Sequence, residues 1–469
     1  MFYKYFLILL CFANSLILLT DPPEPSGRRL RIIVADKYPD HSIIIGGTTG
    51  AWALGTDTGC LLDREFSYVT PENDFKQQTI HPNPSTWNWT RADKWIRHIA
   101  DHQQILRMHC PIGPQCSVWA KDDSRTPEQL ETNLREFLTA VCQRYNGKLG
   151  IKYMDVVNET VVGGDWNKNK PGTDHWECPW YIIGQDTDKN KTPLYIKIAF
   201  EIAQQYAPNI KLIYNQHGGL NDPGSWKLIA ETIQYLREKG LRVDGIGWQA
   251  HVDNGWATPT KLNRLRRLID WAHSNNLEFH ITEASVYLKN GLSQEALEQQ
   301  ATTYRAIIEV LLEKRFSGKV GWNIWDMDDG HCNNKEWYPS LFDANYEAKP
   351  AYYAIQTALE NGAPSRVDDN QKSPDLKNFV LEQNYPNPFN QSTIINYLLK
   401  ISLDVSLKIY DVRGNKLRTL VDKFQNSGNY EVVWNGKDDS GNSVDSGVYF
   451  CQLKTANGYS RTRKLLLLK

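Results

Sequence analysis

The chain has 469 residues and a formal net charge of -1. That length exceeds one ordinary domain and suits a barrel of about 250 to 400 residues with a small second domain. The balanced charge offers no basic surface for nucleic acid, so we expect no nucleic-acid partner and favour a neutral one such as a polysaccharide. The 16 tryptophans agree with a sugar partner, because aromatic rings stack on sugar rings, although a place in the core is their commoner use.

Residues 1–20 have the pattern of a secretory signal peptide. Lys4 precedes the apolar run FLILLCFA at 6–13, and polar residues then interrupt it. The interruption argues against a stable membrane span and leaves a signal anchor as the alternative. A lipoprotein anchor at Cys11 is disfavoured, because no small residue directly precedes that cysteine. We therefore expect an exported bacterial protein, either secreted or held at the cell surface.

From residue 40 to 360 the chain alternates short apolar runs with amphipathic stretches. The stretches 127–145 and 259–274 carry apolar residues on one helical stripe. This alternation predicts the α/β class and a (β/α)8 TIM barrel, in which crossover helices join parallel strands. The runs that we predict as strands are 42–45, 66–69, 104–109, 153–157, 211–214, 244–248, 278–281 and 320–324.

Polar residues recur where these strands end. A buried parallel strand should be apolar throughout, so such endings indicate a shared mouth of the barrel. Glu159 and Glu283 are the most informative, because a pair of carboxylates at a barrel mouth is the equipment of a glycosidase. Each residue alone has a plainer explanation, since a strand-end glutamate is often a solvated rim charge and a lone histidine or tryptophan often belongs to the core.

Several segments, taken in order, resemble the family 10 glycoside hydrolases, chiefly endo-β-1,4-xylanases. The likeness spans the barrel and includes the helix and strand around 199–215. The segments that carry it are TPENDFK (70–76), DVVNE (155–159), DGIGWQAH (244–251), ITE (281–283) and LFDANYEAKPAYYAI (341–355).

The resemblance implies a retaining double displacement, with Glu159 as general acid/base and Glu283 as nucleophile. Gln249 and His251 are expected to hydrogen-bond the nucleophile, and Asn158 is expected to hold the sugar 2-hydroxyl. Matching positions place further substrate contacts in the glycone subsites and around the reacting sugar. These contacts are Glu72, Asn73, Lys76, His109, Asn215 and Trp322.

The chain departs from the family pattern beside the site. Gly113 and Pro114 stand where the family has tryptophan and histidine, and Gly330 stands where a second tryptophan is expected, with Trp337 as a candidate replacement. Xylan is therefore the first substrate that we expect. A retaining glycosidase for another β-glycan and a polysaccharide-binding barrel with little turnover are the alternatives.

No metal and no cofactor are expected, and the chain is expected to be a monomer. His102, His109, Cys110 and Cys116 lie close in sequence but lack the compact spacing of a zinc ribbon. Calcium in the loop 326–329 is a minor alternative. In an exported chain Cys110 and Cys116 are a candidate disulfide, with two thiols as the other reading.

Residues 361–378 are polar without an apolar period, which predicts a linker. Residues 379–469 are alternating and turn-rich, which predicts a small all-β, Ig-like sandwich. A generic sandwich and a carbohydrate-binding module are the alternatives, and the module is disfavoured because we expect few exposed aromatics beyond Tyr385, Phe389 and Trp434.

This tail resembles the C-terminal sorting domains of the type IX secretion system, which implies that the secretion machinery is a partner. The segments that carry the resemblance are NYPNPFN (384–390), IYDVRG (409–414), WNGKD (434–438) and SGVYF (446–450).

Overall fold

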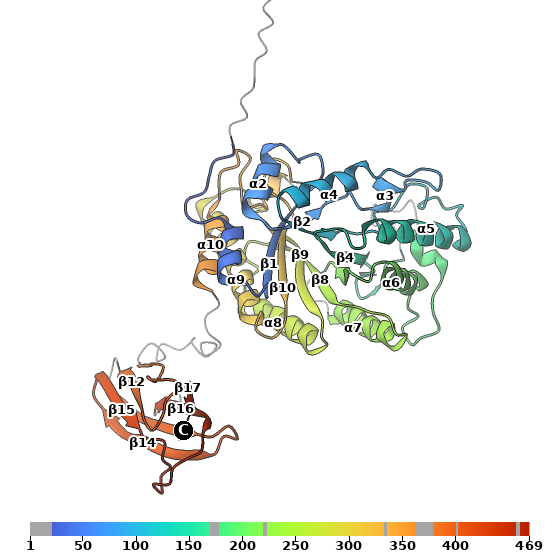
Figure 1. Cartoon of the computed structure of the whole chain (residues 1–469). Helices are drawn as coiled ribbons and strands as arrows, with labels where there is room; N and C mark the ends of the chain where they lie inside the picture. The colour runs from blue at the N-terminus through green and yellow to red at the C-terminus, as the bar shows by residue number, and fades with distance from the viewer. Residues whose placement is uncertain are drawn as a thin grey trace, which may run out of the picture. The chain divides into compact units, whose positions relative to one another are not determined.

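The computed structural model describes residues 21–168, 178–218, 223–332, 335–362, 379–399, 402–455 and 460–468. It divides into two compact units, Met1–Ala363 and Pro364–Lys469, whose elements are labelled in Figure 1. The predicted signal peptide, and all of the predicted linker after residue 362, lie outside the described residues.

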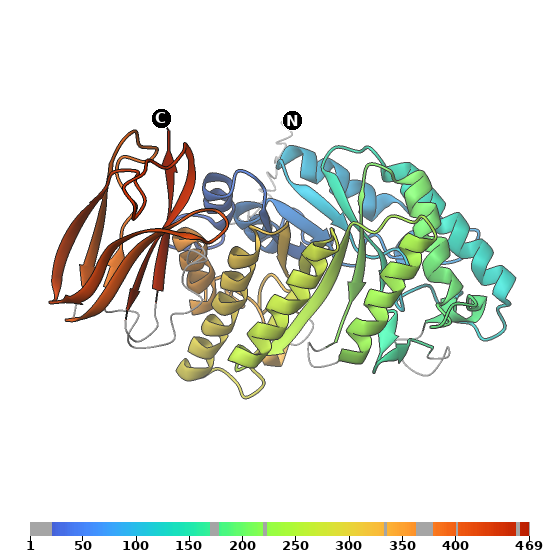
Figure 2. The same cartoon turned by 90° about the horizontal axis from the view of Figure 1, so that it is seen from below.

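The first unit is a closed barrel of parallel strands in the order β1-β10-β9-β8-β7-β4-β3-β2. Each strand run predicted from the sequence falls on one of these strands, so the TIM barrel is confirmed. Figures 1 and 2 show strands inside and helices outside. The strands are β1 (Ile43–Thr49), β2 (Tyr68–Pro71), β3 (Ile105–Met108), β4 (Ile151–Asn158), β7 (Lys211–Gln216), β8 (Gly245–Asp253), β9 (Glu278–Tyr287) and β10 (Val320–Ile324).

The two predicted helices form at the expected bounds, as α5 (Pro127–Tyr145) and α8 (Pro259–Ser274). Thr126 caps α5 through a capping box with Gln129, and proline follows at the first helical position. The other helices are α1 (Leu30–Lys37), α2 (Asp57–Glu65), α3 (Gln77–Ile80), α4 (Thr90–Asp101), α6 (Leu194–Tyr206), α7 (Pro223–Glu238), α9 (Gln294–Lys314) and α10 (Pro350–Asn361). Short pieces are β5 (Val161–Val162), β6 (Asp165–Trp166), and the 3-10 turns η1 (Pro179–Ile183) and η2 (Lys335–Trp337).

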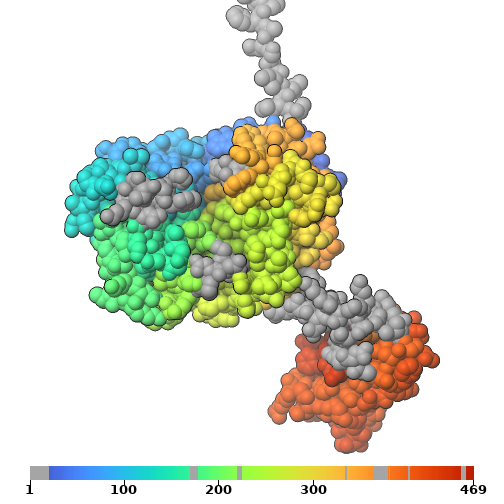
Figure 3. All heavy atoms as spheres, turned by 180° about the vertical axis from the view of Figure 1, so that it is seen from behind, coloured from blue at the N-terminus to red at the C-terminus, as the bar shows by residue number. Residues whose placement is uncertain are grey.

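The barrel closes where its first strand meets its last. Ile43 of β1 pairs with Val320 of β10 in parallel register. In Figure 3 the colour runs around the unit in chain order and brings blue atoms beside orange ones, as closure requires. Helix α1 lies before the predicted start at residue 40 and belongs to the same unit, since the hydroxyl of Tyr38, just after it, donates to the carbonyl of Leu359 at 2.7 Å.

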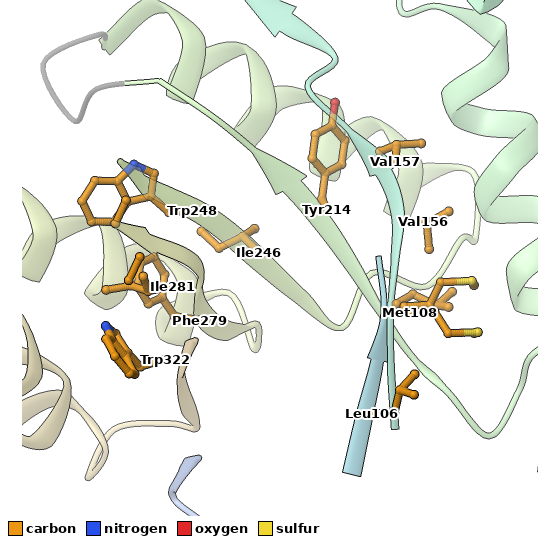
Figure 4. Close-up of a cluster of buried hydrophobic side chains, with 14 of the residues drawn as sticks. Leu106, Met108, Val156, Val157, Tyr214, Ile246, Trp248, Phe279, Ile281 and Trp322 are labelled. Atoms are coloured by element: carbon orange, nitrogen blue, oxygen red, sulfur yellow. The ribbon is translucent and has the colours of Figure 1, made fainter. Parts of the chain in front are cut away.

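The main core lies between the strands and the surrounding helices. Figure 4 shows part of it, with Trp322 beside Phe279 and Ile281. Trp322 has no exposed surface, and its ring meets that of Tyr304 edge-on at 6.1 Å. Its neighbour Asn323 faces the barrel interior, where its amide donates to the hydroxyl of Thr48. Side chains alternate along a strand, so Trp322 points outward, and the expectation that it lines a sugar subsite is wrong.

The second unit is all-β, as predicted, with a three-stranded sheet β11-β12-β15 and a four-stranded sheet β14-β13-β16-β17. Phe389 and Trp434, considered above as aromatic candidates, are 2% and 0% exposed and belong to its core. Gly414 and Gly441 have φ of +84° and +85°, the left-handed conformation that tight turns between strands require. The strands are β11 (Phe379–Leu381), β12 (Thr393–Leu399), β13 (Leu403–Tyr410), β14 (Lys416–Gln425), β15 (Gly428–Trp434), β16 (Gly447–Thr455) and β17 (Ser460–Leu467).

Cys110 is a free thiol, so the candidate disulfide with Cys116 does not form. Burial raises the pKa of the Cys110 thiol, which keeps it protonated and unreactive. Within the described part of the chain, no helix combines the length and the apolar content that a membrane crossing needs.

Replacing Trp322 with alanine should destabilise the barrel unit by about 3–5 kcal/mol, because it leaves a cavity between β10 and α9. Urea unfolding followed by helical circular dichroism measures this, since all described helices lie in the barrel unit. The matched control is Trp52→Ala, whose side chain is 47% exposed, with an expected change within about 0.5 kcal/mol. Equal losses in the two variants would contradict the core assignment.

Candidate active site

The two glutamates come from two barrel strands that are not neighbours. Glu159 directly follows β4, and Glu283 lies on β9; they are 5% and 4% exposed. Glu159 has a left-handed backbone, with φ of +55°, and its N–H donates to the carbonyl of Asn215 at 3.2 Å. This conformation is uncommon outside glycine and marks a constrained strand end. Strands β7 and β8 lie between β4 and β9 in the barrel order.

Three amide side chains join the two carboxylates, and we call Asn158, Asn215 and Gln249 the amide triad. Asn215 Nδ2 donates to Glu283 Oε1 at 3.2 Å and to Asn158 Oδ1 at 2.8 Å. Gln249 Nε2 donates to the same Asn158 oxygen and to Glu159 Oε1, both at 3.0 Å. Gln249 was expected on the nucleophile side, and that expectation is corrected: its amide holds Glu159. The strand register brings these side chains together. Asn158 pairs with Asn215 across β4 and β7, and Gln249 pairs with Glu283 across β8 and β9.

Glu283 is held in its ionised form. His251 Nε2 lies 3.2 Å from Glu283 Oε2, as expected from the sequence, and His109 Nε2 lies 3.8 Å from Oε1. Burial by itself raises the pKa of Glu283, but the hydrogen bond from His251 and the neighbouring positive charges outweigh it and lower the pKa to about 2. The carboxylate is therefore available as a nucleophile over the whole ordinary pH range.

Glu159 is shifted in the opposite direction. Burial raises its pKa, and the negative charge of Glu283 adds to the effect. The nearby His217 and the hydrogen bond from Gln249 act against the increase without cancelling it. One buried carboxyl group thus keeps its proton more readily while its partner loses it, which is the division of labour that an acid/base and nucleophile pair needs.

A buried ion pair supports the site from inside the barrel. Arg107 on β3 donates to Asp155 Oδ2 on β4 at 2.5 Å and to the carbonyl of Thr282 at 2.7 Å. His109 Nδ1 lies 2.8 Å from the same Asp155 oxygen, so Nδ1–H donates to it and Nε2 faces Glu283. Arg107 and Asp155 were not among the site residues predicted from the sequence. They could have been found as charged residues inside strands that should be apolar.

Aromatic rings form one wall of the site. Trp325 directly follows β10, and its ring meets those of His109 and His251 edge-on at 5.2 and 6.4 Å. Trp325 therefore takes the place that we expected for Trp322. The sequence could have indicated this, because side chains alternate along a strand and residue 325 therefore faces the barrel interior, as Asn323 does. Trp337, the candidate replacement tryptophan, lies farther out, at 5.1 Å from Tyr287, whose ring stacks on that of His251.

One of the three glycone candidates lines a pocket beside Trp325. Glu72 lines it, and Asn73 donates to Glu72 Oε1 at 2.9 Å. Lys76 is buried, and its ammonium group hydrogen-bonds the amide oxygen of Gln115. Trp52, which was not predicted from the sequence as a site residue, also lines the pocket. The full lining is Thr48, Thr49, Trp52, Thr58, Glu72, Trp325, Asp326, Met327, Asp328 and His331.

Gly113 confirms that the opposite wall differs from the expected pattern. A Cβ atom at this position would lie 3.2 Å from the Cβ of Asn158 and 3.3 Å from the sulfur of Cys110. The Gly113 carbonyl accepts a hydrogen bond from the indole of Trp180 at 3.1 Å. Even a Cβ atom at 113 would press on Asn158 of the amide triad, so this wall is formed by a residue without a side chain.

The histidines considered above for metal binding, His102 and His109, lie in different places. His109 belongs to the glutamate site, whereas His102 lies at the end of α4 with Asp63 and His98. In the loop 326–329, Asp328 accepts a hydrogen bond from the hydroxyl of Thr58 at 2.9 Å, and Asp329 forms an ion pair with Lys349 at 2.9 Å. These carboxylates are committed to protein groups, so the loop gives no support for calcium.

The chain matches two family models. The model described as glycosyl hydrolase family 10 covers residues 34–358, and the FlgD Ig-like domain covers residues 390–458. The first match contains every candidate site residue named above.

The similar proteins are xylanases by name. The chain is 30% identical to endo-1,4-beta-xylanase A of Caldicellulosiruptor saccharolyticus, over 70% of this chain and 96% of that protein. It is 29% identical to endo-1,4-beta-xylanase B of Thermotoga neapolitana, over 65% and 83% respectively. Among solved structures, xylanase 10B from Thermotoga petrophila RKU-1 in complex with xylobiose superposes with a TM-score of 0.61 at 28% identity, covering 72% of this chain and 99% of that one.

Replacing His251 with alanine should raise the pKa of Glu283, because the variant loses the hydrogen bond and the positive charge that favour the carboxylate. Carbon-13 NMR titration of the glutamate carboxyl groups measures the shift, with Glu283→Gln identifying the resonance. The control is His41→Asn, since His41 is exposed and an asparagine tolerates its φ of +53°. An unchanged pKa in His251→Ala would show that this contact does not set the ionisation.

Proposed function

The chain belongs to glycosyl hydrolase family 10, and from this premise we propose that it cleaves β-1,4-xylosidic bonds in xylan with retention of anomeric configuration. The observation that carries the proposal is the opposite perturbation of two buried carboxyl groups, Glu159 and Glu283, joined by the amide triad. The names of the similar proteins supply the expected substrate.

In the first step the Glu283 carboxylate attacks the anomeric carbon. A carbon–oxygen bond forms to Glu283 as the glycosidic bond breaks, and Glu159 donates its proton to the leaving oxygen. The second step reverses the roles: Glu159 takes a proton from water, which attacks the same carbon and releases Glu283.

The electrostatics favour this exchange of roles. The charge on Glu283 contributes to the raised pKa of Glu159, and that charge disappears when the glycosyl ester forms. The pKa of Glu159 should then fall, so the group that acted as an acid becomes a base at the step that needs one.

Asn158 is suited to hold the substrate. Its Oδ1 is occupied by hydrogen bonds from Asn215 and Gln249, so its amide N–H groups are the ones oriented to donate to a sugar hydroxyl. Trp325 and Trp52 offer apolar ring faces beside the Glu72 carboxylate. This combination of ring faces and acceptors is the chemistry that recognises pyranose rings.

The alternatives are another β-glycan and a barrel that binds without turnover. The second is disfavoured, because a binding surface has no use for two carboxyl groups with separated pKa values. Incubating the full chain with xylans, β-glucans and mannans tests all three. We expect xylo-oligosaccharides whose new reducing ends are first β by proton NMR. Initial α products would contradict retention, and hydrolysis of glucan or mannan alone would contradict xylan as substrate.

Two matched variants separate the roles of the glutamates. Glu283→Gln should lose nearly all activity on both xylan and an aryl xyloside with a good leaving group, because it cannot form the glycosyl ester. Glu159→Ala should lose about 10²- to 10⁴-fold on xylan but retain glycosylation by the aryl substrate, seen as a burst of released phenol, since that leaving group needs little protonation. Equal losses of Glu159→Ala on the two substrates would argue against the acid role.

For the second unit we propose an address rather than a substrate-binding role. The support is the signal-like pattern of residues 1–20, the resemblance of the tail to type IX sorting domains, and the small number of strongly exposed aromatic rings in its described residues, which include Tyr385 and Phe424. Of Tyr385, Phe389 and Trp434, only Tyr385 is exposed, at 79%. A carbohydrate-binding module would need several such rings on one surface.

Ending the chain after Lys372 should leave turnover on soluble xylan unchanged, because every candidate catalytic and substrate-binding residue lies in the unit Met1–Ala363. Delivery to the cell surface of a type IX-competent host should fail. Turnover is measured on the purified proteins, and delivery by cell fractionation. A truncated protein that folds but loses turnover, or that still reaches the surface, would contradict the address.

A further inference from the structure

Outside the active site, Asp63, His98 and His102 bring three potential metal ligands together. Their ligand atoms all lie within 4.8 Å of one another. His98 and His102 are four residues apart at the end of α4, so they share one face of the helix, and their rings stack at 4.2 Å. Both point at Asp63 in the last turn of α2: His98 Nε2 lies 2.8 Å from Oδ1, and His102 Nε2 lies 3.3 Å from Oδ2.

The contacts of His102 are more than a neutral imidazole can satisfy. Its Nδ1 lies 2.9 Å from the carbonyl oxygen of His98, and its Nε2 faces Asp63, so both ring nitrogens face acceptors. A neutral ring has one N–H. If Nδ1–H donates to the carbonyl, Nε2 presents a lone pair to a carboxylate, which is repulsive unless a cation or a second proton lies between them. Donation of one ring N–H to a carbonyl is also the usual arrangement of metal-bound histidine.

Surrounding groups hold this geometry. Gln104 is 3% exposed and donates from Nε2 to Asp63 Oδ1 at 3.1 Å, which orients the carboxylate. Arg31 donates to the backbone carbonyl oxygens of Asp63 at 2.6 Å and of His102 at 3.1 Å, so it links the ends of α2 and α4. These two hydrogen bonds use backbone atoms and do not occupy the side-chain ligand atoms of Asp63 and His102.

We propose that Asp63, His98 and His102 bind one divalent transition-metal ion, with Zn²⁺ as the best fit. Two imidazole nitrogens and one carboxylate oxygen, completed by water, form a ligand set that suits Zn²⁺ at distances of about 2.0–2.2 Å. The site lies where α2 and α4 end, before β2 and β3 begin, and therefore at the opposite end of the barrel from the glutamates. The bound ion joins two helix ends and has no part in hydrolysis.

The test is zinc binding to the tag-free full chain after chelator treatment, at neutral pH. Competition with a chromophoric zinc indicator should show one strongly bound ion per chain, and Zn²⁺ should raise the melting temperature of the barrel unit. His102→Ala, whose side chain is 40% exposed in the wild type, and Asp63→Asn should each weaken binding at least about tenfold and abolish the thermal shift. Hydrolytic activity should be unchanged in both.

Two controls distinguish this site from other zinc ligands. Cys60→Ser removes the only exposed cysteine among the described thiols, and His41→Asn removes an exposed histidine elsewhere. Both variants should bind zinc like the wild type. The proposal is overturned if the wild type binds no zinc, which would leave a doubly protonated His102 as the explanation. It is overturned equally if His102→Ala and Asp63→Asn bind normally, or if Cys60→Ser loses the ion.

Discussion

Two carboxyl groups buried side by side repel one another when both are ionised, and the inner face of the barrel mouth is organised around that constraint. The amide triad supplies hydrogen bonds to Glu159 and Glu283 without supplying a charge, so it satisfies both groups while leaving their difference in ionisation intact. Charge compensation is stronger at Glu283, where His251 and Arg107 lower the pKa, than at Glu159, where the nearby His217 opposes the effect of burial without cancelling it. The asymmetry separates the two pKa values, and that separation is what acid/base chemistry needs.

The polar interior beneath the site follows from the same constraint. His109 can face Glu283 because Asp155 holds its other nitrogen, and Asp155 is stable in the interior because Arg107 neutralises it. Removing one member of such a buried pair is strongly destabilising, since the remaining charge is left without compensation. The chain of contacts from Glu283 through His109 and Asp155 to Arg107 therefore supports both the catalytic carboxylate and the stability of the barrel.

The walls around this centre come from the loops that follow the strands. Gly113 stands where a ring was expected on one wall, close beside Asn158. On the other wall, Trp325 packs against His109, and Trp52 lies across the pocket with Glu72. The loop changes redistribute aromatic surface around the sugar site and leave the carboxylate pair untouched, which is how one barrel supports different glycan preferences.

The sequence by itself determined the eight-stranded barrel, helices α5 and α8, the all-β second unit and the location of both glutamates in or directly after barrel strands. These follow from local periodicity and from the rule that parallel strands share one mouth. Tertiary structure alone decided that Gln249 holds Glu159, that Trp325 rather than Trp322 faces the site, and that Cys110 stays a thiol. It also brought Asp63 to His98 and His102. The physical reason is register: which side chains meet across neighbouring strands and helix ends depends on how the barrel closes, and no local pattern along the chain encodes that closure.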